Sequence, residues 1–174
     1  ALVVVQGLLI AGAFFVAMRP QVGGDLKVGI AVTLVLAGLA GLAAGLLISA
    51  SSRNEARAVS LVLPYVVLQF FFAGVVVPIS EMGALGVAAW VVSSRWAVAG
   101  LGSLAQLVPT AQHRVAAQQA EHGGGVVSPD TQFLDRYGTD FFTVPSPVFV
   151  GALVVLTVAA AWLTHKALIR SART

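Results

Sequence analysis

The sequence predicts an all-α membrane protein with four transmembrane helices, a re-entrant helical pair and one long external loop. Hydrophobic residues make up 58% of the 174 residues, whereas charged residues make up only 10%. The charges are unevenly spread, so several uncharged windows exceed the roughly 18 residues that indicate a bilayer span. One soluble core could not bury so much apolar surface. We therefore treat residues 1–174 as a single transmembrane domain.

Four stretches are long and apolar enough to cross the hydrocarbon core of a bilayer. They are residues 1–18, 28–50, 58–77 and 148–166. Arg19-Pro20 ends the first stretch, and Gly23-Gly24-Asp25 has a turn composition, which predicts a tight helical hairpin. Ser52 and Glu55 have the spacing of a capping box. The third helix is therefore expected to begin near Arg53.

A stripe of small residues recurs at every fourth position of the second span. Its members are Gly29, Thr33, Ala37, Gly41, Gly45 and Ser49. Lipid tails are as apolar as leucine, so helices in a bilayer gain by close backbone approach, which small residues permit. The stripe predicts a helix-packing face, although a chain this rich in Ala and Gly also produces such spacing by chance.

Residues 84–108 resemble a fifth span but are predicted to dip into the membrane and return. Ser93-Ser94-Arg95 splits the stretch into short pieces, and segments of this length are more often re-entrant than spanning. With a re-entrant pair, five basic residues share one side of the membrane, opposite only Arg19 and Lys27 among the short loops. These five are Arg53, Arg57, Lys166, Arg170 and Arg173. This distribution places the C-terminus inside the cell.

Residues 109–145 form the predicted external loop. The pattern predicts a short helix from Thr110 to about His122 and another after Ser128-Pro129. Phe141 and Phe142 are expected at the outer membrane interface.

The sequence lacks several motifs that carry common chemistries. There is no Cys, and neither Lys lies in a phosphate-binding G-x-x-x-x-G-K-[ST] loop. The basic residues are dispersed and form no clustered stripe of the kind that binds nucleic acids. The four spans hold no ionisable residue between their ends, and Gln6 and Gln69 are the only strongly polar side chains at depth. Gln69 is expected to form interhelical hydrogen bonds. Arg95, in the re-entrant turn, is expected to meet water or Glu81.

Three linked motifs resemble the membrane domain of ABCG/White-like (type V) ABC exporters. The run from Gly41 into Ser52-Arg53-Asn54-Glu55-Ala56 looks like the family's fourth helix and the cytosolic turn after it. Residues 70–78, Phe-Phe-Phe-Ala-Gly-Val-Val-Val-Pro, resemble its "F-S-G-x-x-x-P" motif. Ser93-Ser94-Arg95-Trp96-Ala97 is similar to its "S-P-x-R-[YW]" element, with Ser94 in place of the proline. The resemblance is stronger to bacterial members of this family than to animal members.

This resemblance implies that the third span lines a substrate cavity at a dimer axis. The cavity residues would be Leu63, Val66, Val67 and Phe70, and the gate would be Val75 and Val76. The first four also share one helical face by their spacing. The alternative for this face is contact with lipid or with a neighbouring helix.

The leading interpretation is therefore the permease part of an ATP-driven ABC exporter that moves an amphipathic or lipid-linked substrate across a bacterial inner membrane. The resemblance implies a dimer with a second copy or a related half-transporter. It also implies an upstream or partner nucleotide-binding domain, and ATP and Mg²⁺ would bind there rather than in this chain. The alternatives are a secondary transporter fragment and a structural subunit of a membrane complex. We identify no catalytic residue, metal ligand or cofactor site in the sequence.

Overall fold

A computed structural model of the chain describes residues 2–18, 24–52, 54–74, 79–122, 128–137 and 139–171. Within these ranges every secondary-structure element is a helix, which confirms the all-α prediction. The elements are α1 (Leu2–Met18), α2 (Gly24–Ser51), α3 (Glu55–Phe71), the 3₁₀ element η1 (Ile79–Val91), α4 (Ser93–Leu104), α5 (Leu107–His122), α6 (Pro129–Tyr137) and α7 (Ser146–Ser171).

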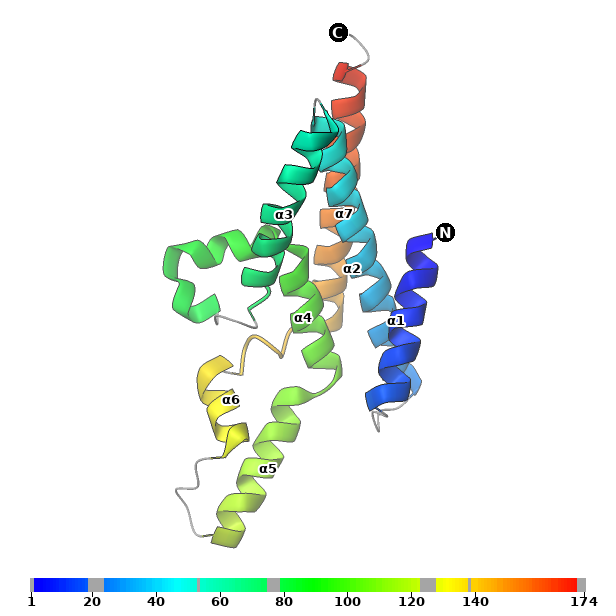
Figure 1. Cartoon of the computed structure of the whole chain (residues 1–174). Coiled ribbons are helices and arrows are strands. Elements are labelled where there is room, and N and C mark those ends of the chain that lie inside the picture. The colour runs from blue at the N-terminus through cyan, green and yellow to red at the C-terminus, as the bar shows by residue number, and fades with distance from the viewer. Residues whose placement is uncertain are drawn as a thin grey trace.

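The helices α2 and α7 pack along each other and form the spine of the molecule (Figure 1). They have 28 and 26 residues, so they are about 42 and 39 Å long at a rise of 1.5 Å per residue. Both are long and apolar enough to cross a membrane, and the structure therefore shows two candidate membrane spans. The apolar helices α1 and α3 have 17 residues each, or about 26 Å.

Glycine residues bring α1 close to α2. A Cβ atom added to Gly7 would lie 2.9 Å from Val35 Cγ2, and one added to Gly38 would lie 3.3 Å from Val3 Cγ1. Any larger residue at Gly7 would therefore push the two helices apart.

The predicted small-residue stripe of α2 packs at one end only. Gly29 faces Leu104 of α4, and Thr33, which is buried, donates a hydrogen bond to the Gly29 carbonyl. At Gly41 and Gly45, an added Cβ would meet nothing within 4 Å. The expected packing face is thus present near the start of α2 and open toward its end.

The short helix α4 packs against both α2 and α7 and completes the core. Trp96 packs against Phe149 and Leu153 of α7, and all three side chains are buried. A Cβ added to Gly100 would lie 2.5 Å from the Phe149 ring. Because Gly100 has no side chain, this ring can lie directly against the backbone of α4.

The start of α3 differs from the prediction. Asn54 is the N-cap, and its side chain accepts a hydrogen bond from the Arg57 backbone N–H at 2.9 Å. The Ser52 hydroxyl instead donates to the carbonyl of Ile48 at the end of α2. The expected capping box of Ser52 and Glu55 is therefore wrong, because the hydroxyl bonds within the helix that it ends.

The α5 and α6 helices extend beyond one end of the bundle, opposite the end where α2 meets α3 and where α7 finishes (Figure 1). They match the two helices predicted within residues 109–145. An ion pair of 3.9 Å between Arg114 and Asp130 joins them, and Ser128 and Thr131 exchange capping hydrogen bonds at the start of α6.

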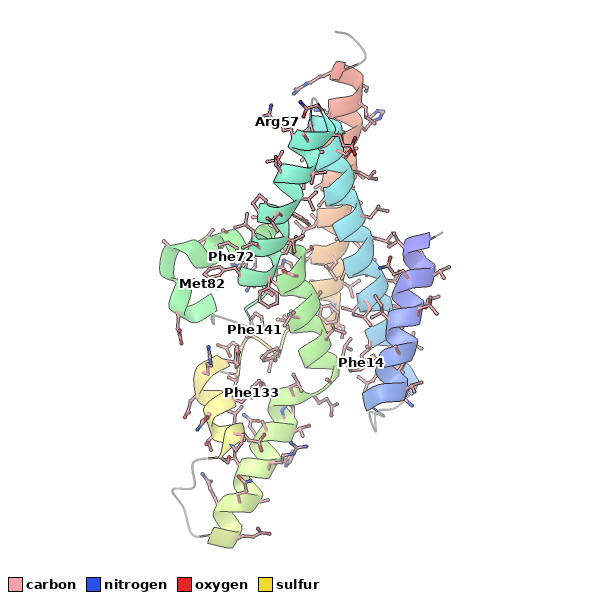
Figure 2. All side chains as sticks on the ribbon, viewed as in Figure 1. Phe14, Arg57, Phe72, Met82, Phe133 and Phe141 are labelled. Carbon is pink, nitrogen blue, oxygen red and sulfur yellow. The ribbon has the colours of Figure 1, made fainter. Side chains whose placement is uncertain are left out.

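Phe142 does not lie where the sequence analysis expected it. Its side chain is only 7% exposed and packs among Phe133, Tyr137 and Phe141, close to Gly102 of α4. It therefore joins the segment that contains α5 and α6 to the bundle, and it is buried within the chain rather than exposed as expected. Figure 2 labels two of these aromatic residues, Phe133 and Phe141, near α6 and the neighbouring end of α4.

Candidate translocation face and helical junction

The four predicted cavity residues form one uncovered apolar face of α3. Leu63 and Phe70 are 70% and 68% exposed, and Val66 and Val67 are 53% and 58% exposed. None of the residues of α3 is buried. The structure thus brings these four side chains together on the side of the helix that no other described part of the chain covers. The predicted gate residues Val75 and Val76 lie outside the described residues.

The opposite side of α3 is bonded to the start of α4 through Gln69. The Gln69 side-chain oxygen accepts hydrogen bonds from the Ser94 backbone N–H at 3.0 Å and from the Ser93 hydroxyl at 3.3 Å. The Ser94 hydroxyl donates to the Gln69 carbonyl, and the Gln69 amide donates to the Tyr65 hydroxyl at 2.6 Å. The prediction that Gln69 is an interhelical hydrogen-bonding residue is confirmed.

The two short helices expected from residues 84–108 meet at Val92. The backbone of Val92 is extended, with φ −98° and ψ 121°, and α4 begins at the next residue. On the other side, η1 kinks at Gly83, whose φ of 53° and ψ of −128° lie in a region that favours glycine. The break falls one residue before the predicted Ser93-Ser94-Arg95 turn.

The junction between η1 and α4 at Val92 lies level with the middle of the two long helices, α2 and α7. Val91 and Ser93 line a small cavity of about 210 Å³ together with Tyr65 and Gln69 of α3. Its other walls come from central parts of α2 and α7, namely Ala40, Ala44, Leu47, Leu156, Ala159, Ala160 and Leu163. The chain between α3 and α5 therefore reaches the mid-level of the bundle before α4 leads away toward α5 (Figure 1).

Arg95 contacts two tryptophan rings at this junction. Its guanidinium carbon lies 4.4 Å from the centre of the Trp90 ring and 4.9 Å from that of Trp96. The Trp96 indole N–H donates to the Trp90 carbonyl at 2.9 Å, which fixes the two residues relative to each other. Glu81 is exposed, and no ion pair between its carboxylate and Arg95 is seen among the described residues. The expected contact of Arg95 with Glu81 is therefore not present.

The family model of the ABC-2 type transporter matches residues 1–104. The chain belongs to this family. The match ends at the last residue of α4, so it contains both the open face of α3 and the junction at Gln69. The chain is accordingly the permease part of an ABC-type transporter, a membrane domain that works with an ATP-binding component and contacts lipid. No curated protein and no solved structure matches the chain.

Several residues of the junction of this ABC-2 permease were not predicted from the sequence. Trp90 and Tyr65 look like ordinary apolar residues of their segments, and only the fold brings them to Arg95 and Gln69. For α4, a usable signal was present, because its buried residues are small or aromatic. They are Trp96, Ala97, Ala99, Gly100 and Gly102. In the part of the chain that the structure describes, no three His, Asp or Glu side chains lie close enough to hold a metal ion.

Proposed function

We propose that this permease is the membrane part of an ATP-driven exporter that moves an amphipathic or lipid-linked substrate. In this proposal it is a multi-pass protein of a bacterial inner membrane and pairs with a second copy or a related half-transporter. Residues 1–174 then form one transmembrane domain with spans at 1–18, 28–50, 58–77 and 148–166. Residues 84–108 are re-entrant, and residues 109–145 are outside the cell.

The observation that carries the proposal is the open apolar face of α3. A face that contains Leu63 and Phe70 and that the chain itself leaves uncovered suits a cavity shared with a second subunit. Such a cavity selects its ligands by shape and by desolvation of apolar surface, because it offers no charged side chain for pairing. An amphipathic molecule, with one large apolar part, meets this requirement.

The level of the junction and the distribution of charge support the proposed topology. The break at Val92 lies beside the central parts of α2 and α7, which is the depth that a re-entrant turn reaches. Arg57, Lys166 and Arg170 lie toward the end of the bundle where α3 begins and α7 finishes. The positive-inside rule makes that end cytoplasmic and leaves α5 and α6 outside.

In the proposed mechanism, closure of the ATP-binding components rocks the helices of the membrane domain. The substrate enters against Leu63, Val66, Val67 and Phe70, and the constriction at Val75 and Val76 opens to release it outward. α4 is packed in the core, so it is the frame against which α3 moves. Gln69 is the main polar contact between this frame and the cavity helix.

The gate is tested with Val75→Trp in the intact transporter, reconstituted in proteoliposomes with a fluorescent phospholipid as the probe. We expect Val75→Trp to block movement of the probe while ATP hydrolysis remains measurable, because the larger ring fills the constriction. Val155→Trp is the matched control, since Val155 is 66% exposed and lies on another helix, α7. Equal transport by both variants would refute the gate. ATP hydrolysis by the unmodified transporter without movement of the fluorescent phospholipid would refute the proposed amphipathic or lipid-linked substrate.

A further inference from the structure

The guanidinium group of Arg95 has donors that no acceptor satisfies. Its Nε and Nη1 atoms are buried and have no hydrogen-bond partner. An arginine carries five N–H donors, and a buried donor without an acceptor is costly. The faces of Trp90 and Trp96 attract the positive charge but accept no strong hydrogen bond. The site therefore holds a cation and lacks an anion.

The depth of Arg95 in the membrane raises the energetic cost of its missing hydrogen-bond acceptor. Arg95 lies two residues after Ser93, and Ser93 lines the cavity beside the middle of α2 and α7. In the proposed topology this level lies in the hydrocarbon region, where an unpaired charge is expensive, draws water and lipid headgroups toward it by local thinning of the bilayer, and usually marks a functional site. No acidic side chain in the described ranges pairs with it, so the guanidinium is open to an anion supplied by a ligand.

We propose that Arg95, Trp90 and Trp96 form a binding site for a phosphate group, either that of an anionic phospholipid or the free ion. The planar guanidinium matches two phosphate oxygens, and charge-assisted bonds of this kind are stronger than neutral ones. Arg95 is only partly covered, and Trp90 is 58% exposed, which leaves one side of the site open. This inference rests on the re-entrant topology of the proposed function.

The surroundings of Trp90 suit the apolar part of such a lipid. Val87 and Val91 are 71% and 72% exposed on the same element, η1, so an acyl chain can lie beside the ring while the phosphate reaches the guanidinium. In contrast, the exposed Arg114 on α5 already pairs with Asp130. Arg114 is therefore a matched control for a charge change outside the site.

The test is quenching of Trp90 fluorescence by brominated lipids in the intact transporter, reconstituted in nanodiscs. The Trp90 signal is the component that disappears in Trp90→Phe. We expect brominated phosphatidylglycerol to quench it saturably and brominated phosphatidylcholine to quench it far less. Arg95→Gln should raise the half-saturating fraction of phosphatidylglycerol about tenfold. Arg95→Lys should lie between, and Arg114→Gln should match the unmodified protein.

Excess inorganic phosphate distinguishes the two sources. Displacement of phosphatidylglycerol shows that the free ion is sufficient, whereas persistence of quenching shows that the site needs the lipid; both support a phosphate site. Equal quenching by the two lipids, or an unchanged curve in Arg95→Gln, would overturn it and leave the rings as the only partners of Arg95. Such a failure would not alter the Val75→Trp result, so the site and the transport function are tested separately.

Discussion

The helices α3 and α4 are neighbours that meet at Gln69, yet they are held in opposite ways. α3 has 17 residues, is rich in Val, Leu and Phe, and has no buried residue. α4 has 12 residues, many of them Ala, Gly and Ser, and five of them are buried. In a membrane, burial follows from close backbone approach rather than from hydrophobicity, because lipid satisfies large apolar side chains equally well. The helix with the smaller side chains therefore forms the frame, and the more apolar helix stays available for substrate or partner.

The largest expected effect comes from filling the space between α4 and α7. Gly100→Ala should destabilise the domain by about 1–3 kcal/mol, because its Cβ would collide with the Phe149 ring. The measurement is the thermal unfolding midpoint in detergent. Gly151→Ala is the control, since a Cβ at Gly151 on α7 meets nothing within 4 Å. Equal midpoints for the two variants would mean that α4 is not packed as described.

The second-largest effect on stability is expected from the hydrogen bonds that join α3 to α4. Gln69→Leu should cost about 1–2 kcal/mol, because it leaves the Ser94 backbone N–H and the Ser93 hydroxyl without their acceptor. Gln119→Leu, at an exposed position of α5, should have no such effect. Additivity of Gln69→Leu and Ser93→Ala in a double-mutant cycle would contradict a direct interaction between these two side chains.

A smaller effect is expected where α3 begins. Asn54→Ala should cost about 1 kcal/mol, because it removes the acceptor for the Arg57 N–H. Ser52→Ala should cost less, since the Ser52 hydroxyl bonds to the last turn of α2 and does not cap α3. A larger loss for Ser52→Ala would restore the capping box that the sequence predicted.

The smallest effect on stability is expected on the open face itself. Leu63→Ala should change the unfolding midpoint little, because Leu63 is 70% exposed and its removal leaves no internal cavity. The same variant should alter transport of the fluorescent phospholipid, since this face lines the proposed cavity. Normal transport in Leu63→Ala and in Phe70→Ala would assign the face to lipid.

The sequence predicted the helical elements well and their contacts only in part. Apolar length and turn residues are local properties, so α1, α2, α3 and α7 could be expected at nearly their observed positions. The family resemblance assigned Leu63, Val66, Val67 and Phe70 to a cavity, and helical spacing placed them on one face, which the structure shows to be exposed. The position of Arg95 between two tryptophan rings could not be predicted, because that contact depends on the fold between η1 and α4. The cap of α3 was misplaced because Ser52 and Asn54 both fit the pattern, and only geometry separates them.

The central claim is that residues 84–108 enter the membrane and return to the side from which they came. The chain has no cysteine, so single cysteines at Ala56, Ala120 and Ile169 of the intact transporter can be labelled with an impermeant maleimide. The three positions are exposed near the start of α3, near the end of α5 and near the end of α7, respectively. We predict labelling of position 120 from outside the cell, and of positions 56 and 169 only after the membrane is opened. Labelling of 169 from outside, with 120 protected, would show that residues 84–108 span the bilayer and would contradict the topology.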